Sequence, residues 1–325
     1  MRDFDPIECR IFEAIVGSNL YGTATPESDM DYRGVCIPPM DVLLNPFMPF
    51  EQKDSGFKEE DRAIYALGKF LKTCADANPN IIELLFIPKQ SIIFTTKYWD
   101  KIIENKHLFI SKKARFTFSG YAISQLNAIK NHRQWFINPP KNKPERKDFD
   151  LTDNPVVSGE NLENALNIPH ELFKPEYHEE LVRERAYRFE KKKWDNYISW
   201  KNNRNPKRRE LEDKYGYDAK HASHLFRLMT EGKELLLTGN ITFPLPNAEE
   251  IRNIKNGLYE YEEMLEKAEM FDREFETWYN ESILPKAPDR NKLTELYFEI
   301  IEEYNNHANK YTIAKWSKRN YTKSK

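Results

Sequence analysis

The stretch that decides the fold is GSNLYGTATPESDMDYRGV, residues 17–35. It follows a short run rich in Ile, Phe and Val, CRIFEAIVG, which predicts a β-strand that ends at Gly17. A small, polar turn comes next. The alternating pattern of residues 29–37 then predicts a second strand, which Pro38 ends. The stretch therefore predicts a strand, a turn and a strand.

Asp29 and Asp31 are two residues apart in the second predicted strand. This spacing puts both carboxylates on one face, with Cα atoms about 6.5–7 Å apart. Two anions held together raise the pKa of one of them unless a cation compensates, and oxygen ligands suit Mg²⁺ or Mn²⁺. Each feature is common alone, since Asp-x-Asp occurs on solvated strands and Gly17-Ser18 is an ordinary turn. Together they predict a turn that binds a phosphate beside a divalent metal ion.

The rest of the chain changes character at about residue 110. Before it, we expect a strand near residues 50–57 and a helix over residues 63–77. After it, the apolar spacing predicts helices over residues 114–132, 177–214, 218–239, 248–279 and 291–308, with a proline-rich loop at 137–160. The predicted fold class is α+β: a small mixed-sheet domain over residues 1–110, followed by a mostly helical domain over residues 111–325.

The composition excludes several classes of protein. Apolar residues make up 39% of the 325 residues, which is enough for a core and excludes wholesale disorder. No run of about 18 apolar residues exists, so no membrane-spanning helix is expected. The start, MRDFDPIECR, is unlike a signal peptide. Cys9, Cys36 and Cys74 cannot pair completely, so we expect free thiols and a cytoplasmic location.

The net charge of −2 conceals an uneven distribution. Residues 1–110 carry 12 basic and 17 acidic side chains, whereas residues 111–240 carry 25 and 19. An acidic region beside a basic one is typical of a metal-using site next to a surface that binds a polyanion. A surface rich in charge also divides unevenly by chance, so this observation supports the motif without replacing it.

The pattern G-S-x-x-Y-G-T-A-T-P-x-S-D-x-D-x-R-G-V, from Gly17 to Val35, resembles the nucleotidyltransferase signature of the DNA polymerase β superfamily. More narrowly, it resembles the branch of predicted nucleotidyltransferases associated with RNA repair. Further segments that resemble this branch are residues 67–71, 78–79, 83–85, 120–125, 220–228 and 284–285. The resemblance therefore covers most of the chain, apart from about residues 140–215 and the tail.

The resemblance implies a catalytic centre with three carboxylates. The first two are Asp29 and Asp31, and the third comes from a neighbouring strand. We expect Asp61 in that role, and the sequence leaves four other acids open: Glu51, Asp54, Glu59 and Glu60. The three acids would bind two Mg²⁺ or Mn²⁺ ions, and the triphosphate of an NTP would lie on Gly17 and Ser18.

Cationic side chains supply further nucleotide-binding candidates. Arg33 shares the strand face of the aspartates, although a structural ion pair is the alternative. Lys69 is expected to reach the triphosphate, although it can also be a solvated surface lysine. A helical segment adds Lys220, His221, His224 and Arg227. The spacing of its first, third and fourth members predicts one cationic face, for which a solvated helix face is the alternative.

A mixture of cations and aromatic rings follows the first long helix. The nucleic-acid-binding candidates are His132, Arg133, Trp135, Lys141 and Lys143. Such side chains suit phosphate contact and base stacking. The alternative is an ordinary basic loop that Trp135 packs in place.

These observations predict a Mg²⁺-dependent nucleotidyltransferase that moves a nucleoside monophosphate from an NTP to an acceptor hydroxyl and releases pyrophosphate. The expected partner is RNA, either a tRNA or a broken RNA end. One alternative is transfer to a protein or small molecule, as in antitoxin-type enzymes. Another is a non-catalytic RNA-binding module. The sequence specifies neither the NTP nor the oligomeric state.

Overall fold

The computed structural model describes residues 4–26, 28–47, 49–54, 61–155, 157–169, 172, 174–203 and 206–321, without the side chains of 206–208, 211, 272 and 307–321. It forms two compact units. The first comprises residues 1–127 and 219–325, and the second comprises residues 128–218. The limits of these compact units differ from the domain boundary expected near residue 110. That boundary separates a catalytic from an acceptor-binding domain, and it stays a prediction.

A five-stranded mixed sheet is the frame of the first unit, with strand order β3-β4-β2-β1-β5. Its strands are β1 (Arg10–Val16), β2 (Asp31–Cys36), β3 (Gln52–Lys53), β4 (Asp61–Ala66) and β5 (Ile92–Thr95). β1 runs antiparallel to β2 and β5, and β3 runs antiparallel to β4. Because β2 and β4 are parallel, their first residues lie at the same edge of the sheet.

Three helices pack near this sheet: α3 (Leu67–Ala75), α5 (Lys97–Glu104) and α13 (Arg290–Tyr321). The helical spacing of Phe70 and its apolar neighbours gives α3 one buried face. The ring of Phe12 in β1 stacks on Trp99 of α5 with centroids 3.8 Å apart, and Phe70 lies 5.3 Å from the same indole. These three rings hold strand and helices together, since each is fully or almost fully buried.

The first unit holds further helices besides these three. They are α1 (Gly17–Tyr21), α2 (Met40–Leu43), α4 (Pro79–Ile82), α10 (Ala219–Thr238), α11 (Ala248–Lys255) and α12 (Tyr261–Glu281), and α6 (Ala114–Ile137) begins here. α10 packs against α11 and α12. A β-carbon on Gly232 of α10 would come within 2.9 Å of Phe275 and 3.0 Å of Phe118, so a glycine permits this close approach.

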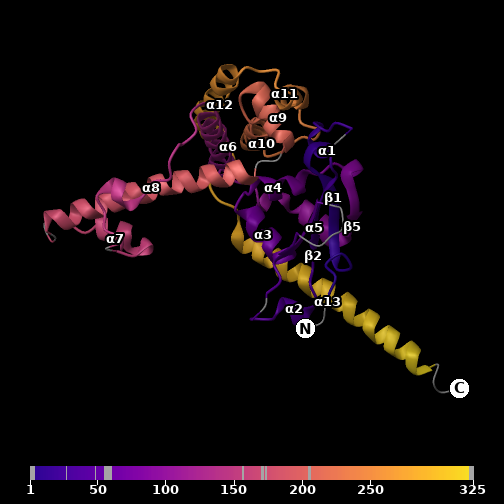
Figure 1. Cartoon of the computed structure of the whole chain (residues 1–325). Helices are drawn as coiled ribbons and strands as arrows, with labels where there is room; N and C mark the ends of the chain where they lie inside the picture. Colours follow the sequence, from indigo (N-terminus) through magenta and orange to yellow (C-terminus); the bar gives the residue numbers. More distant parts are fainter. Residues whose placement is uncertain are drawn as a thin grey trace. The chain divides into compact units, whose positions relative to one another are not determined.

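The second unit is helical. It holds α7 (Leu162–Leu166), α8 (Pro175–Asn203), which Figure 1 shows as one long helix, and α9 (Pro206–Tyr215). Glu184 of α8 is buried and forms ion pairs with Arg146 at 2.8 Å and with Arg188 at 2.6 Å. Two guanidinium groups therefore compensate the buried carboxylate of Glu184.

The structure confirms the α+β class, with a small mixed sheet followed by a mostly helical chain. Predicted elements differ at several points. Residues 63–66 continue β4, because the apolar helical spacing begins only at Leu67. The helix expected over residues 248–279 is broken at Gly257, whose φ of +70° ends α11.

Two smaller expectations are also confirmed. The three cysteines are free thiols. Among the described residues, none of the helices is at once long enough and apolar enough to cross a membrane.

Candidate active site

Gly17 and Asp31 lie against each other where β1 ends and β2 begins. Val16 pairs with Asp31 across the antiparallel strands, and Gly17 follows with a φ of +66°. A β-carbon built on Gly17 would overlap the carboxylate of Asp31. The turn therefore requires glycine at position 17 for two reasons. Its φ is positive, and the Asp31 carboxylate occupies the space that a side chain would need.

Asp31 and Asp61 are direct partners in the register of the parallel strands β2 and β4. Burial raises the pKa of the Asp31 carboxyl, and the negative charge of Asp61 raises it further. The guanidinium of Arg33 and the ammonium of Lys220 act in the opposite direction. The two carboxyl groups therefore interact at one edge of the sheet, which is where a cation would stabilise their charged forms.

Asp29 is exposed and precedes β2, so the strand is shorter than predicted. Its backbone carbonyl accepts a hydrogen bond from Asn19 Nδ2 at 3.2 Å. Because Asn19 belongs to α1, this bond ties the residues before β2 to the helix that begins at Gly17. Ser18 follows Gly17 in the same helix and is partly exposed.

Arg33 connects the two strands at this edge. Its Nη1 lies 3.1 Å from Asp61 Oδ1 and 3.2 Å from the Asp61 carbonyl oxygen, and it also donates to the Tyr32 carbonyl at 2.8 Å. The Asp61 side chain stays 63% exposed, so the ion pair leaves it accessible. Arg33 therefore forms a structural ion pair, which was the alternative to nucleotide binding. Its partner is Asp61, the expected third acid.

The other candidates for the third acid lie elsewhere or outside the described residues. The carbonyl of Glu51 accepts from the Ala66 amide at 2.8 Å, which places Glu51 at the far end of β4 from Asp61. Asp54 follows the edge strand β3, and its carboxylate accepts from Gln52 at 3.0 Å. Glu59 and Glu60 lie outside the described residues. The described geometry favours Asp61, and its catalytic role stays a prediction.

Lys69 is not brought to the aspartates. β4 has six residues, so at about 3.3 Å per residue its end lies roughly 16 Å from Asp61. α3 begins at that end, and the Lys69 ammonium forms an ion pair with Glu51 at 2.7 Å. The helical position of Lys69 was correctly expected, but it lies at the opposite end of the sheet from Asp31.

One face of α10 approaches α1 and the carboxylates. The positive charge of Lys220 lowers the pKa of Asp31, so the first turn of α10 lies near the site. His221 Nδ1 lies 2.5 Å from Gln125 Oε1 of α6, which fixes the ring. His224 is half-buried one turn after Lys220.

Arg227 is buried rather than presented to a ligand. Its Nη1 lies 3.0 Å from the Tyr21 hydroxyl, 3.3 Å from Glu83 and 3.2 Å from Glu231, and its Nη2 donates to Asn80 at 3.0 Å. Arg227 therefore joins α10 to α1 and to the segment after α4. Direct nucleotide contact by Arg227 stays a prediction that this geometry does not favour.

Sequence reasoning missed the partners of Arg227. The Tyr21 hydroxyl donates to Glu83 Oε2 at 2.9 Å, and Glu83 and Glu231 are both almost fully buried. Burial raises the pKa of Glu83 to about 7 and that of Glu231 to about 8. The available signal was Glu83, an acid within the apolar run of residues 81–87, because a buried acid needs a partner.

The nucleic-acid-binding candidates lie in the second unit. The rings of His132 and Trp135 stack with centroids 5.6 Å apart, and Trp135 lies 5.5 Å from Trp200. Arg133 donates to the Gly216 carbonyl at 3.1 Å. These three side chains take part in internal packing, as in the alternative interpretation. The side chains of Lys141 and Lys143 are exposed.

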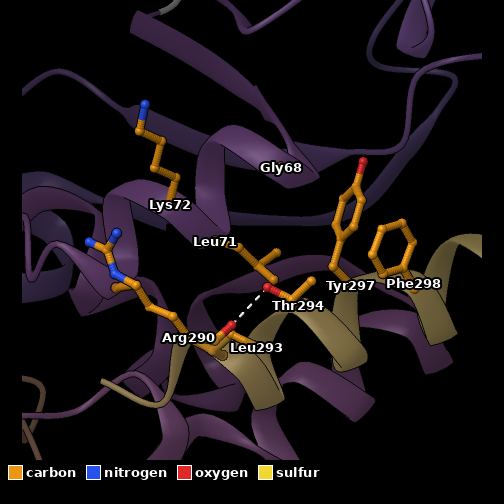
Figure 2. Close-up of a pocket in the computed structure, with 9 residues that line it drawn as sticks. Gly68, Leu71, Lys72, Arg290, Leu293, Thr294, Tyr297 and Phe298 are labelled. Atoms are coloured by element: carbon orange, nitrogen blue, oxygen red, sulfur yellow. Dashed lines mark hydrogen bonds between the residues drawn. The ribbon is translucent and has the colours of Figure 1, made fainter. Parts of the chain in front are cut away.

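A separate groove of about 270 Å³ lies between α3 and α13 (Figure 2). Leu71 and Leu293 line it, with Tyr297 and Phe298 along α13. Thr294 Oγ1 turns back to donate to the Arg290 carbonyl at 2.8 Å. None of the residues that line the groove is acidic or belongs to the Gly17–Asp31 site, so this groove is separate from the candidate active site.

Comparisons with known proteins agree with the motif. Residues 3–138 match the family model of the RNA repair pathway DNA polymerase beta family. This match confirms the resemblance to the polymerase-β-like nucleotidyltransferases of the RNA-repair branch over those residues. An uncharacterised 38.9 kDa protein of Enterobacteria phage T4, from the nrdC–mobD intergenic region, is 23% identical over 288 residues, which cover 79% of this chain and 85% of the phage protein. No solved structure matches the chain significantly.

Proposed function

We propose that the protein is a nucleotidyltransferase that acts on an RNA end. The premise is the match of residues 3–138 to the RNA repair pathway DNA polymerase beta family. It moves a nucleoside monophosphate from an NTP to an acceptor hydroxyl. The observation that carries the proposal is the juxtaposition of Asp31 with both Gly17 and Asp61 at one edge of the sheet.

The side chains at this edge fit a divalent cation. They offer carboxylate oxygens, the donor type that Mg²⁺ and Mn²⁺ prefer. Burial first and then the negative charge of Asp61 raise the pKa of the Asp31 carboxyl, and a bound cation would favour its charged form. Asp29, Asp31 and Asp61 would hold the metal, expected as two ions. Bound there, the metal would supply positive charge that stabilises the attacking and leaving oxygens.

The protein's own groups would orient the reactants. The turn at Gly17 and Ser18 would donate hydrogen bonds to phosphate oxygens, with the Ser18 hydroxyl as one donor. The exposed Asp61 carboxylate would accept the proton of the acceptor hydroxyl. The acceptor oxygen would then form a bond to the α-phosphorus as the bond between that phosphorus and its bridging oxygen breaks. Pyrophosphate would leave with the electron pair.

RNA is the acceptor that the charge distribution favours. Residues 111–240 carry 25 basic and 19 acidic side chains, and Lys141 and Lys143 are exposed in the second unit. When exposed lysines contact the phosphates of a nucleic acid, counterions bound to that nucleic acid are released, and this release favours binding of a polyanionic acceptor. Transfer to a protein or a small molecule, and RNA binding without catalysis, are the competing outcomes of the experiment below.

The experiment uses NTPs labelled at the α-phosphate, with Mg²⁺ or Mn²⁺. The acceptors are intact tRNA, tRNA cleaved in a loop, and total cell lysate. We expect metal-dependent label on the RNA end, and its loss in Asp31→Asn with the fold kept by circular dichroism. Label on a protein band would establish protein transfer instead. RNA binding without any transfer by the wild type would leave the non-catalytic module.

A further inference from the structure

The groove between α3 and α13 has an apolar inner surface and no role in the proposed chemistry. Leu71, Ala75 and Leu293 line it and are almost fully buried. Phe298 of α13 also lines it but is 64% exposed, and its ring lies beside that of Tyr297 with centroids 5.6 Å apart. An exposed aromatic ring beside a hollowed apolar surface is typical of a place where another molecule binds.

The charged side chains that line this groove lie at one end of it. Figure 2 shows Lys72 and Arg290 at the end opposite Tyr297 and Phe298. The Lys72 side chain is exposed, and within the part of the chain that the structure describes its ammonium forms no ion pair. A molecule that fills the groove therefore meets positive charge at one end and aromatic rings at the other.

Arg290 adds positive charge to this end although it has a partner. Its Nη2 lies 2.7 Å from Asp76 Oδ1, and Lys113 Nζ lies 2.6 Å from the same oxygen. Two cations thus share one carboxylate, and Lys72, one helical turn before Asp76, is a third. Because the Arg290 side chain is 64% exposed, it stays accessible to an anionic partner.

The rest of α13 favours a protein segment over a nucleic acid as the occupant. Glu295, Glu299 and Glu302 are exposed on this helix and do not line the groove. A phosphate chain that ran along α13 would meet these carboxylates, and like charges repel. From Arg290 to Phe298 the helix rises about 12 Å, at 1.5 Å per residue, which is about two turns. A short segment with an anionic end and an apolar body fits this length and this distribution of charge.

We propose that the groove between α3 and α13 is a docking site for a partner protein, which contributes an amphipathic helix with an acidic end. Apolar side chains three, four and seven residues apart in that helix lie over Leu71, Leu293 and Phe298. Its acidic side chains lie against Lys72 and Arg290. The apolar contacts supply most of the affinity, and the charges set the orientation.

The docking site lies away from the proposed chemistry. α3 begins where β4 ends, which is the opposite end of that strand from Asp61. A bound partner would therefore leave the edge of the sheet with Asp31 and Asp61 open. The inference goes beyond the proposed function and does not depend on nucleotide transfer.

The test measures binding of synthetic helical peptides to the full chain by fluorescence polarisation. Each peptide has about 14 residues and a staple on its polar face, which keeps it helical. The acidic peptide carries leucines at i, i+3, i+4 and i+7 and glutamates in one terminal turn. A second peptide has lysines in place of the glutamates, and a third has serines in place of the leucines. We expect the acidic peptide to bind at least about 10-fold more tightly than either of the others.

Two exposed residues of the groove are replaced in turn. Phe298→Ala should weaken binding of the acidic peptide about 10-fold. Lys72→Glu should weaken it by a similar factor and should strengthen binding of the lysine peptide, a gain that a folding defect would not produce. Phe116→Ala is the matched control for the ring, since Phe116 is 65% exposed on α6. Lys89→Glu is the control for the charge, and both control residues lie outside the groove, so binding should be unchanged.

Several results would overturn the docking site. One is a dissociation constant of the acidic peptide weaker than about 1 mM for the wild type, and another is an unchanged affinity in Phe298→Ala. Self-association of the wild type that Phe298→Ala abolishes, measured by sedimentation, would assign the groove to a second copy of this chain. Binding of labelled single-stranded RNA that both Phe298→Ala and Lys72→Glu abolish would assign it to a nucleic acid.

Discussion

The carboxylate of Asp31 fills the space that a side chain on Gly17 would occupy. A β-carbon at Gly17 would come within 2.9 Å of Asp31 Cγ, and the φ of Gly17 is +66°. The tight bend and the acidic side chain are thus one structural unit. Any residue other than glycine at position 17 must move the carboxylate that the proposed chemistry uses.

Gly17→Ala should therefore impair activity more than folding. The left-handed conformation costs a non-glycine residue about 1–2 kcal/mol. A displacement of Asp31 by about 1 Å should lower the rate of nucleotide transfer about 100-fold. Single-turnover rates and thermal unfolding measure the two effects.

Gly120→Ala is the matched control, because a β-carbon there meets nothing within 4 Å and the residue lies within α6. It should increase stability by about 0.5–1 kcal/mol and leave the transfer rate unchanged. A Gly17→Ala variant with the wild-type rate would show that the contact with Asp31 has no part in catalysis.

Substituting the candidate acids one at a time identifies the third catalytic acid, because only its loss should stop nucleotide transfer. Asp61→Asn should reduce the rate about 10²–10⁴-fold, because Asp61 pairs in register with Asp31 and is accessible. Glu51→Gln removes an acid at the other end of β4 and should change the rate less than about twofold. Asp54→Asn serves as a second control beside the edge strand. Equal losses in Glu51→Gln and Asp61→Asn would contradict this assignment.

The local parts of this site could be predicted from the sequence, since a strand, a turn and a short alternating strand are set by neighbouring residues. The pairing of Asp31 with Asp61 could not be read in the same way. It depends on parallel strands separated by 24 residues of intervening chain, between Cys36 and Asp61. The resemblance supplied the expectation of a third acid, and the register of β2 and β4 supplies its position.

Helical spacing correctly placed Lys220, His224 and Arg227 on one face, but it does not reveal what that face meets. At Arg227 this face contacts Tyr21, Glu83 and Asn80, and the guanidinium donates its hydrogen bonds to these buried or partly buried side chains. For Lys69, the spacing identified a helix but not the direction of the strand before it. Both placements depend on contacts between distant segments, which local periodicity does not contain.

Lys141 and Lys143 should contribute to RNA binding through charge alone. Their joint replacement by alanine should weaken RNA binding. Each phosphate contact with a single strand contributes about 0.7 to the slope of log association constant against log salt concentration, so the loss of two contacts should reduce the magnitude of that slope by about 1.4. Lys147→Ala is the control in the same loop, because that lysine already pairs with Glu145. Filter binding at several salt concentrations measures the slope.

Trp135→Ala should behave differently from these lysine variants. Its indole packs against Trp200 and Tyr197, so its loss should lower Tm without changing the salt slope. A slope that is unchanged in the double lysine variant would show that RNA does not contact this loop.

The two acids buried beside Arg227 should make stability fall as the pH rises from about 5 to about 8. Burial raises the pKa of Glu83 to about 7 and of Glu231 to about 8, from an ordinary value of 4.5. An acid whose pKa is raised by folding stabilises the protein fully below its unfolded pKa, and that contribution is lost as the pH rises through the folded pKa. The free energy of unfolding should therefore decrease from about pH 5 to about pH 8 and then level off, by about 1.4 kcal/mol per pH unit for each acid that is protonated in the folded protein and ionised in the unfolded chain.

Glu231→Gln removes one of these titrations while keeping the size of the side chain. It should flatten the decrease and be more stable than the wild type at pH 9, since a single guanidinium then faces a single carboxylate. Glu234→Gln is the control: this acid lies one turn away, accepts from the Thr242 amide at 2.8 Å, and affects the pKa of Glu231 less than burial, Arg227 and Glu83 do, so the pH dependence should stay close to that of the wild type. Urea unfolding at pH 5, 6, 7, 8 and 9 measures all three proteins. Parallel curves for the wild type and Glu231→Gln would mean that the buried acids do not exchange a proton in this range.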